Sequence, residues 1–319
     1  MSATMSTPPA PGRGPSAFDA AQQAIDHTRR HLFPFRFERW LVLGCVAFLD
    51  QCGRQQAMGG RFSAPWPGTW GGGGGGGRPA GTGEDVTKAV EWLGTHALVV
   101  AMVAAAVLAV MVVFVAVVLW LNSRGVFMYA DDVASGRADF ERPWREHAAR
   151  AGSYFAWSFG LTVATLAAVL VLVAAALMAL VALVSGPPGS GLTAGLGLAA
   201  VVVLFLAVLV VAGLASLGLR DFVAPLQIHA GVGCGAAIRL LRDLVVAHPG
   251  VFVVYVLLKI VFGIASGILV LVAACLTCCC VLLPIVTQTA LQPLFFFERA
   301  WSLFLLRQLG HDLIGPAAK

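Results

Sequence analysis

One lysine lies inside a long apolar stretch, where an ionisable side chain is a candidate for chemistry. Lys259 is the only charged residue among the 54 residues of 244–297, and charges within a membrane are costly and often mark a functional site. Gln288 and Gln292 follow with a spacing of four residues, which places them on one stripe of a helix. If the chain turns at 275–276, Lys259 and Gln292 reach equal depth. We therefore predict an intramembrane polar patch of Lys259, Gln288 and Gln292.

Simpler interpretations of these three residues stay open. Lys259 lies about eight residues from the predicted cytoplasmic end of its helix, a depth of ~12 Å that a lysine stem can largely cover by snorkelling. The two glutamines can also hydrogen-bond to neighbouring helices without meeting the lysine.

The other chemistry-bearing residues form no catalytic pattern. Residues 275–280 contain a Cys-x-x-Cys, but without the second pair or the histidines of a zinc site, so we predict apolar packing, with a disulfide to Cys52 as the alternative. Asp131 and Asp132 are assigned to a solvated loop face that pairs with nearby arginines. The histidines match no metal or catalytic motif, and the glycine run 71–77 lacks the context of a phosphate loop. We predict no enzymatic activity, no cofactor and no metal.

The composition shows which solvent surrounds these residues. Apolar residues make up 59% of the 319 residues and charged residues only 12%, about half of the charge of a soluble domain. A soluble globule, a disordered chain and a nucleic-acid-binding module are excluded. We predict an all-α, polytopic transmembrane helix bundle with cytoplasmic amphipathic segments, and its first partner is the lipid bilayer.

The long uncharged stretches predict about six spans. Residues 151–219 are 69 residues without Asp, Glu, Lys or Arg, or roughly 100 Å of helix against a hydrocarbon core of ~30 Å. This stretch must fold back, and the glycines and prolines of 185–190 mark its turn. The predicted spans are 36–50, 97–121, 154–184, 192–218, 250–274 and 279–298.

These spans form a predicted transmembrane domain of residues 35–310 with a Gly-rich outer loop at 51–83. Residues 1–34 are predicted as a cytoplasmic tail, disordered at first and then an interfacial helix over 16–32. Residues 233–247 are amphipathic and should lie on the membrane surface or cap the bundle. Residues 311–319 form the C-terminal tail.

The positions of the cations predict the orientation. With six spans, sixteen of the 21 Lys and Arg residues fall on the side of the termini and four on the other side. Because cytoplasmic loops retain cations, both termini are predicted to be cytoplasmic. The Arg-, Ala- and Gly-rich composition indicates a bacterial gene and therefore the cytoplasmic (inner) membrane.

A short motif occurs three times on the predicted cytoplasmic side. Phe-Glu-Arg followed by Trp begins at residues 37, 140 and 297. Aromatic rings and guanidinium groups together are typical of anchors at the headgroup layer, although a duplicated block that docks a cytoplasmic partner is the alternative. The predicted interfacial anchors are Arg39, Trp40, Arg142, Trp144, Arg299 and Trp301.

Several short segments together resemble a family of uncharacterised bacterial six-helix membrane proteins. They are Trp120-Leu-Asn-Ser-Arg124-Gly-Val-Phe127, Pro143-Trp144, Leu240-Leu241-Arg242, His248-Pro249-Gly250, Leu283-Pro284, Pro293-Leu294, Phe297, Arg299 and Leu306-Arg307-Gln308-Leu309-Gly310. The resemblance covers about residues 35–310 and implies a similar fold without implying an activity. More remotely, the chain is similar to the membrane portion found with some glycerophosphodiester phosphodiesterases, whose catalytic barrel is absent from this sequence.

Two functions remain in view. The first is a non-enzymatic scaffold, assembly or membrane-organising protein that contacts other membrane or cytoplasmic proteins. The alternative is a transporter or channel for a small or lipid-like substrate, which would use the patch around Lys259, Gln288 and Gln292. A transporter would line a water-filled cavity with broken helices, whereas a scaffold would be a dry bundle.

Overall fold

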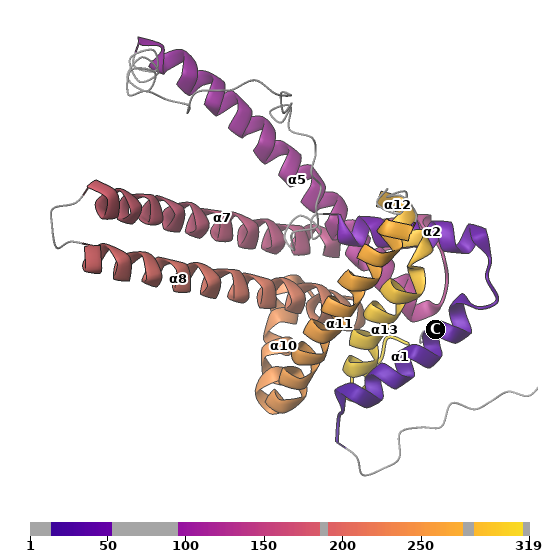
Figure 1. The fold of residues 1–319 in the computed structure, drawn as a ribbon. Coiled ribbons are helices and arrows are strands. Elements are labelled where there is room, and N and C mark those ends of the chain that lie inside the picture. The colour runs from indigo at the N-terminus through magenta and orange to yellow at the C-terminus, as the bar shows by residue number, and fades with distance from the viewer. Residues whose placement is uncertain (1–13, 53–94, 186–190, 277–283, 315–319) are drawn as a thin grey trace, which may run out of the picture. The chain divides into compact units, whose positions relative to one another are not determined.

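The computed structural model describes residues 14–52, 95–185, 191–276 and 284–314, and the secondary structure in these ranges is helical, without a strand (Figure 1). The chain is therefore all-α, as predicted. Its helices are α1 (Ala17–Leu32), α2 (Phe37–Gln51), α5 (Ala97–Ser135), α6 (Glu141–Glu146), α7 (Ala148–Ser185), α8 (Gly191–Gly218), the π-helix η1 (Leu219–Val223), α9 (Ala224–Ala230), α10 (Cys234–Ala247), α11 (Pro249–Leu276), α12 (Pro284–Ala290) and α13 (Gln292–Gln308). Two compact units divide the chain. The larger one contains residues 1–51 and 120–319, and the smaller one contains residues 52–119 with the first part of α5.

Four of the described helical stretches are long and apolar enough to cross a membrane: Ala97–Ser135, Ala148–Leu183, Gly191–Ala230 and Pro249–Ala273. They contain the predicted spans 97–121 and 192–218 in full, and the spans 154–184 and 250–274 except for the last residue of each. The helices α8 and α11 match their predicted spans closely, whereas α5 continues beyond residue 121 through Arg124, Asp131 and Asp132 to Ser135.

The first of the six predicted spans is not a full-length membrane helix. α2 has 15 residues, or about 22 Å of helix against a hydrocarbon core of ~30 Å. Its apolar side chains Leu43, Val46 and Ala47 are fully buried within the protein. The apolar residues of 36–50 therefore serve protein packing, and the prediction of an ordinary span here is not supported.

The sixth predicted span is also different from the prediction. Residues 279–283 lie outside the described part of the chain, and the remainder of 279–298 is divided between α12 and α13, which meet at Leu291. Pro293 in the first turn of α13 cannot donate to the carbonyl of Thr289, which weakens the helix at this junction. The predicted turns at 185–190 and 275–280 fall mainly outside the described residues.

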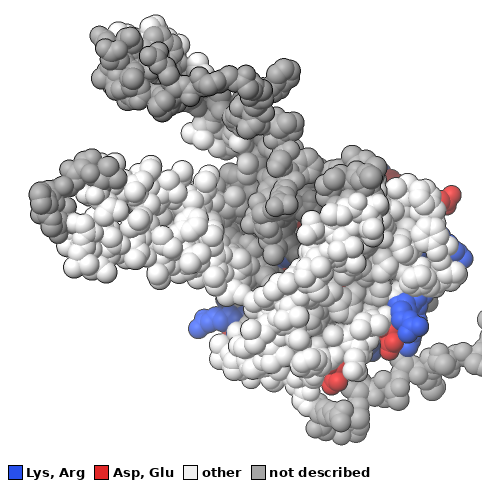
Figure 2. Space-filling view, viewed as in Figure 1, with Lys and Arg blue, Asp and Glu red and all other residues white. Residues whose placement is uncertain are grey.

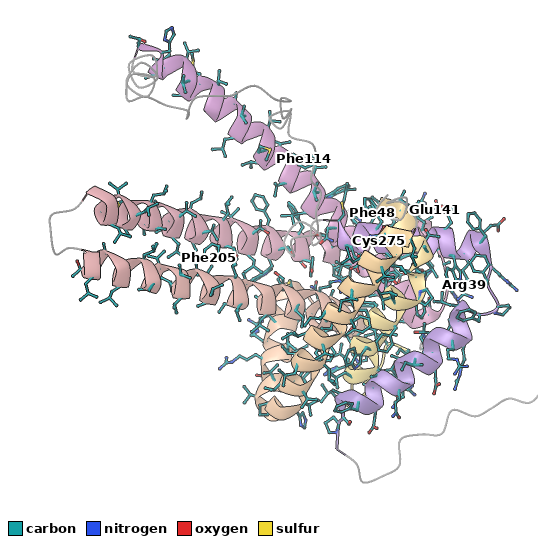
Figure 3. All side chains as sticks on the ribbon, viewed as in Figure 1. Arg39, Phe48, Phe114, Glu141, Phe205 and Cys275 are labelled. Carbon is teal, nitrogen blue, oxygen red and sulfur yellow. The ribbon has the colours of Figure 1, made fainter. Side chains whose placement is uncertain are left out.

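The helices α7 and α8 lie side by side in the larger unit (Figure 1). Their surface in Figure 2 carries no Lys, Arg, Asp or Glu, in accordance with the uncharged stretch 151–219. Leu172 is 7% exposed, whereas Leu170 on the same helix is 60% exposed. Phe205 of α8 is half-buried (Figure 3). The hairpin therefore has a narrow packed seam, and its remaining surface is apolar and open.

The N-terminal helix packs against α13 rather than lying apart from the bundle. Ser16 caps α1 by accepting a hydrogen bond from the backbone N–H of Asp19. The buried residues in the first half of α1 are small, Ala17, Ala20 and Ala24, which lets α13 approach closely, and His27, Thr28 and Leu32 continue the buried face. The predicted helix is present, and its apolar side chains Phe18 and Ile25 are 59% and 48% exposed, so these two do not face the core.

The amphipathic segment 233–247 forms α10 with the predicted two faces. Cys234 and Ala237 are buried, whereas Arg239, Arg242 and Asp243 are exposed. The core of the larger unit continues along α13, where the side chains from Arg299 to Leu306 are all buried.

Candidate functional site

Six ionisable side chains are buried together in the larger unit. Three are carboxylates and three are cations, so their formal charges cancel. We call them the ion cluster: Asp50, Asp221, Glu298, Arg220, Lys259 and Arg299.

Four elements supply the ion cluster, each at the end of an apolar stretch or within one. α2 contributes Asp50 as its last residue but one, and α11 contributes Lys259. The π-helix η1 contributes the neighbours Arg220 and Asp221, and α13 contributes the neighbours Glu298 and Arg299. Short π-helical turns are rare and occur often at functional sites. In this protein the π-helix directs the adjacent side chains of Arg220 and Asp221 towards the same buried interior.

Arg220 contacts all three carboxylates of the cluster. Its Nε donates to both carboxylate oxygens of Asp50 at 3.1 Å, and its Nη2 also donates to Asp50. Its Nη1 lies 3.2 Å from Asp221 Oδ1 and 3.2 Å from Glu298 Oε1. A planar guanidinium group is suited to such multiple contacts. Arg220 therefore links α2 and α13 to η1.

Lys259 is held by the protein rather than reaching for the membrane surface. Its ammonium group lies 2.8 Å from Asp221 Oδ2 and 3.3 Å from Glu298 Oε1. Tyr255, one turn earlier on α11, donates to Asp221 at 2.9 Å and accepts from Lys259 at 3.3 Å. Lys259 is 7% exposed. The polar-contact interpretation of this residue holds, and snorkelling does not describe it.

Arg299 is fully buried, with 0% of its surface exposed. Its Nη1 donates to the backbone carbonyl of Arg220 at 2.6 Å, and its Nη2 to that of Val126 at 2.9 Å. A guanidinium group in this position cannot lie on a lipid phosphate. The interpretation of Arg299 as an interfacial anchor is therefore wrong, because its charge is used inside the protein.

The predicted polar patch is only partly brought together. Gln288 and Gln292 are fully buried, as predicted for a patch between helices. Gln292 donates to the hydroxyl of Tyr129 at 3.1 Å, and the amide atoms of Gln288 have no hydrogen-bond partner among the residues that the structure describes. Within the described residues, the bonds of Lys259 lead to Asp221, Tyr255 and Glu298 and to neither glutamine.

Two of the predicted anchors are tryptophans that join the N-terminal helix to the core. Trp301 is 3% exposed and donates from its indole nitrogen to the carbonyl of Ala17 at 2.9 Å. Trp40 is 8% exposed and donates to the carbonyl of Leu32 at 3.2 Å. The two indole N–H groups thus bond to the two ends of α1, and both rings are buried inside the protein.

The remaining anchors are more open. Arg39, near the start of α2 (Figure 3), donates to the carbonyl of Gly136. Arg142 pairs with Asp131 and, on its own helix, with Glu146 at 3.2 Å. Trp144 is half-buried, and the guanidinium carbon of Arg124 lies 5.3 Å from the centre of its ring. The anchor role of Arg39, Arg142 and Trp144 stays a prediction.

Neither a metal nor a redox site is built by the described residues. No group of three or more His, Cys, Asp or Glu side chains among them could hold a metal ion. Cys52 and Cys275 are free, and Cys278–280 lie outside the described ranges, so the alternative of a disulfide is not decided. In the ion cluster each carboxylate lies next to a cation. This arrangement neutralises the charges and does not prepare a carboxyl group for proton transfer.

Sequence reasoning missed Asp221 and Glu298 as partners of Lys259, and it missed Asp50 and Arg220 as further members of the ion cluster. One signal was present, because each of these charges directly borders an uncharged stretch. Boundary charges are usually solvated, and only the fold shows that these meet one another. The pair Tyr255 and Lys259, at i and i+4, was a second signal.

Burial lowers the pKa of two histidines of α1, His27 and His31, and His27 lies against α13. His27 bonds to the carbonyl of Val133 at 2.8 Å and stacks on Phe296, and its ring lies 4.3 Å from that of His31. Burial, opposed by the Val133 bond and helped by Arg30 and Arg307, lowers the pKa of His27. Burial, with His27, Arg39 and Arg30, lowers the pKa of His31 to about 4.

We expect the docking of α1 to weaken as the pH falls from 6.5 towards 4. In this window the undocked histidines, with an ordinary pKa of 6.5, bind protons that the docked ones cannot, so acid favours undocking. The measurement is hydrogen exchange of the α1 amides, corrected for intrinsic rates, at several pH values. Replacing both residues (His27→Gln with His31→Gln) should flatten the profile. An unchanged slope in that variant would refute the assignment.

The comparisons with known proteins give a family without an activity. Residues 15–311 match the model of a family described as a family of unknown function (DUF7544). Neither the curated proteins nor the solved structures contain a match. The remoter similarity to the membrane portion found with glycerophosphodiester phosphodiesterases is not shown.

Proposed function

Because the chain belongs to this family of unknown function over nearly its whole length, we propose a role from its structure: a non-enzymatic integral membrane protein that organises or assembles other membrane proteins. The observation that carries the proposal is the open apolar surface of α7 and α8. Leu170 and Val171 on α7 and Val203 on α8 are at least 60% exposed. Such a surface needs lipid or apolar partners to cover it.

The ion cluster supports a structural role over transport. Each of its six charges has a partner of opposite sign within the cluster, and Lys259 in particular is engaged by two carboxylates. A site that carries a charged substrate would need a charge left over to bind it. The alternative of a transporter or channel is therefore less well supported, although the unpartnered Gln288 keeps it in view.

We place the protein in the bacterial cytoplasmic membrane with both termini cytoplasmic. Contacts between segments that are rich in cations support this orientation. Arg299 bonds to the carbonyls of Val126 and Arg220, and Trp301 bonds to Ala17 of the N-terminal helix. In our proposal these contacts lie outside the hydrocarbon core, so that the segments share one side of the membrane, and cations accumulate on the cytoplasmic side.

A photocrosslinking experiment tests the proposed role. A photoreactive phenylalanine analogue at Leu170, which is exposed, should capture another membrane protein when cells that express the full chain are irradiated. The same analogue at Leu172, two residues away and 7% exposed, is the matched control and should give crosslinks to α8 only. Affinity purification and mass spectrometry identify the products. Lipid adducts alone at Leu170 and at other exposed positions of α7 and α8 would overturn the proposal.

A further inference from the structure

Arg124 carries a positive charge that no carboxylate among the described residues balances. The two arginines of α6 differ from it, since Arg142 pairs with Asp131 and Arg145 lies 2.6 Å from Glu141. Arg124 is half-buried, and its one hydrogen bond to a described residue goes to a backbone carbonyl. A guanidinium group that is left unbalanced at the surface attracts an anion, and its forked N–H donors match the oxygens of a phosphate or carboxylate group.

The protein holds the guanidinium group of Arg124 in one place. Its Nη1 donates to the backbone carbonyl of Trp144 at 2.9 Å, and its central carbon lies 5.5 Å from the ring centre of Trp120 and 5.3 Å from that of Trp144. The two indole rings meet edge to face, with their centres 5.9 Å apart. An aromatic ring attracts a cation above it. Because the side chain is already ordered, an anion that binds it immobilises little further.

Arg124 lies at the boundary of a long apolar stretch. Residues 92–123 contain no Asp, Glu, Lys or Arg, and Arg124 is the first charge that follows them. Trp120, one turn earlier on α5, is 41% exposed. An exposed indole and a cation at the end of an apolar stretch are typical of the headgroup layer. In the orientation that we propose, Arg124 is therefore at the level of the lipid phosphates of the cytoplasmic leaflet, which is rich in anionic lipids.

A third aromatic ring widens the apolar surface around Arg124. Phe140 stacks on Trp144 with the ring centres 5.7 Å apart, and its side chain is 45% exposed. Trp144 is half-buried, so each side chain of the group Trp120, Arg124, Phe140 and Trp144 is at least partly open to the outside. A lipid reaches such a surface from the bilayer and needs no cavity. Its glycerol and upper acyl carbons fit the rings, and its phosphate fits the cation.

We propose that Arg124 binds the phosphate group of an anionic phospholipid, with Trp120, Phe140 and Trp144 packed against the upper part of the lipid. A lone unbalanced cation favours a lipid with a net negative charge over phosphatidylcholine, whose own ammonium group already offsets its phosphate. The proposal rests on the proposed membrane location. It does not involve the assembly surface of α7 and α8, and neither requires the other.

Native mass spectrometry of the full chain in detergent tests the site. Phosphatidylglycerol is added in increasing amounts, with phosphatidylcholine and inorganic phosphate as parallel probes. The wild type should bind its first phosphatidylglycerol more tightly than its first phosphatidylcholine. Arg124→Gln should weaken the binding of phosphatidylglycerol roughly tenfold, as expected when a hydrogen bond to a charged group is lost, and should leave that of phosphatidylcholine nearly unchanged.

Arg145→Gln is the matched control for the charge. It removes an equal charge one residue from Trp144, but from a side chain that is 77% exposed and paired with Glu141, so it should bind phosphatidylglycerol like the wild type. An equal loss in Arg145→Gln and Arg124→Gln would mean general attraction of anionic lipids and would overturn the proposal. Displacement of the lipid by millimolar inorganic phosphate would also overturn it, by assigning the site to a soluble anion.

Thermal unfolding separates binding from stability, since Arg124→Gln also loses the bond to Trp144. A ligand of the folded state raises the unfolding midpoint. Phosphatidylglycerol should therefore raise the midpoint of the wild type, and this increment should be lost in Arg124→Gln whatever the midpoint of the variant without lipid. If that variant does not fold, Arg124→Lys keeps the charge without the fork and should show a smaller increment. An undiminished increment in the variants would refute the site. Because no other protein is present, the result does not depend on the proposed assembly role.

Discussion

Replacing Asp50 by asparagine is expected to lower the free energy of unfolding by about 3–5 kcal/mol, the usual cost of breaking a buried ion pair from one side. Asparagine keeps the shape of aspartate but removes its charge, which leaves Arg220 with a buried charge that Asp50 no longer offsets. Since Arg220 Nε bonds to both oxygens of Asp50 at 3.1 Å, the end of α2 should separate from η1. Reversible unfolding in mixed detergent micelles measures the loss.

A double variant separates the loss of a charge from the loss of a contact. Asp50→Asn with Arg220→Gln removes one charge of each sign, so the four that remain, on Asp221, Glu298, Lys259 and Arg299, again cancel. Its cost should be clearly less than the sum of the two single variants, and the difference measures the coupling. Additive losses would mean that the charges do not act together.

An exposed ion pair provides the comparison for this experiment. Arg145 and Glu141 lie 2.6 Å apart one turn from each other, with side chains that are 77% and 74% exposed. Removing the charge of Glu141 (Glu141→Gln) should change the stability by less than about 1 kcal/mol, because water screens the pair and solvates the remaining arginine. If Glu141→Gln and Asp50→Asn have equal effects, burial is not what makes the cluster important.

Local sequence patterns were sufficient to predict the positions of the long apolar helices. The predicted spans 97–121, 154–184, 192–218 and 250–274 all lie inside helices that could cross a membrane. An uncharged stretch in lipid has to be helical because its backbone groups must bond to each other. The length of such a stretch sets a minimum for the helix, and α5 extends beyond its own stretch to Ser135.

The same rules failed to predict the structure of residues 36–50 and 279–298. In these two segments tertiary contacts determine whether the apolar residues form a membrane span. Both contain enough apolar residues to suggest a span. However, α2 buries its apolar side chains against α12 and other helices, and after the break at Leu291, which Pro293 favours, α13 is buried in the core of the protein. An apolar stretch shows that water is excluded, but it does not show whether lipid or protein excludes it.

The three Phe-Glu-Arg segments have the same short sequence but lie in different structural surroundings. Glu38 is exposed, Glu141 pairs with Arg145 on the surface, and Glu298 lies in the ion cluster. A duplicated block would place its members in equivalent surroundings. These surroundings differ, which favours the interpretation as separate segments over duplication. It also explains why Arg299 could not be assigned from its resemblance to Arg39 and Arg142.

Gly125 provides the second large effect that we expect, because it determines how closely α5 approaches α2. A Cβ atom at this position would lie 2.4 Å from the backbone nitrogen of Asp50 and 2.4 Å from the carbonyl carbon of Leu49. Both are backbone atoms and cannot rotate aside as a side chain could. Asn122, one turn earlier, donates to the carbonyl of Leu49 at 3.1 Å, so this contact also terminates α2.

Gly125→Ala should therefore lower the free energy of unfolding by about 3 kcal/mol, at the upper end of the range for overpacking. The displaced backbone carries Asp50 away from Arg220, so the two sites should not be independent. In the Asp50→Asn background the same substitution should cost less, since the contact is already lost. Gly152→Ala on α7 is the matched control, because nothing lies within 4 Å of its added Cβ, and alanine should be neutral or stabilising there by up to about 1 kcal/mol. Equal stability of the Gly125 and Gly152 variants would mean that the close approach of α5 to α2 does not hold Asp50 in place.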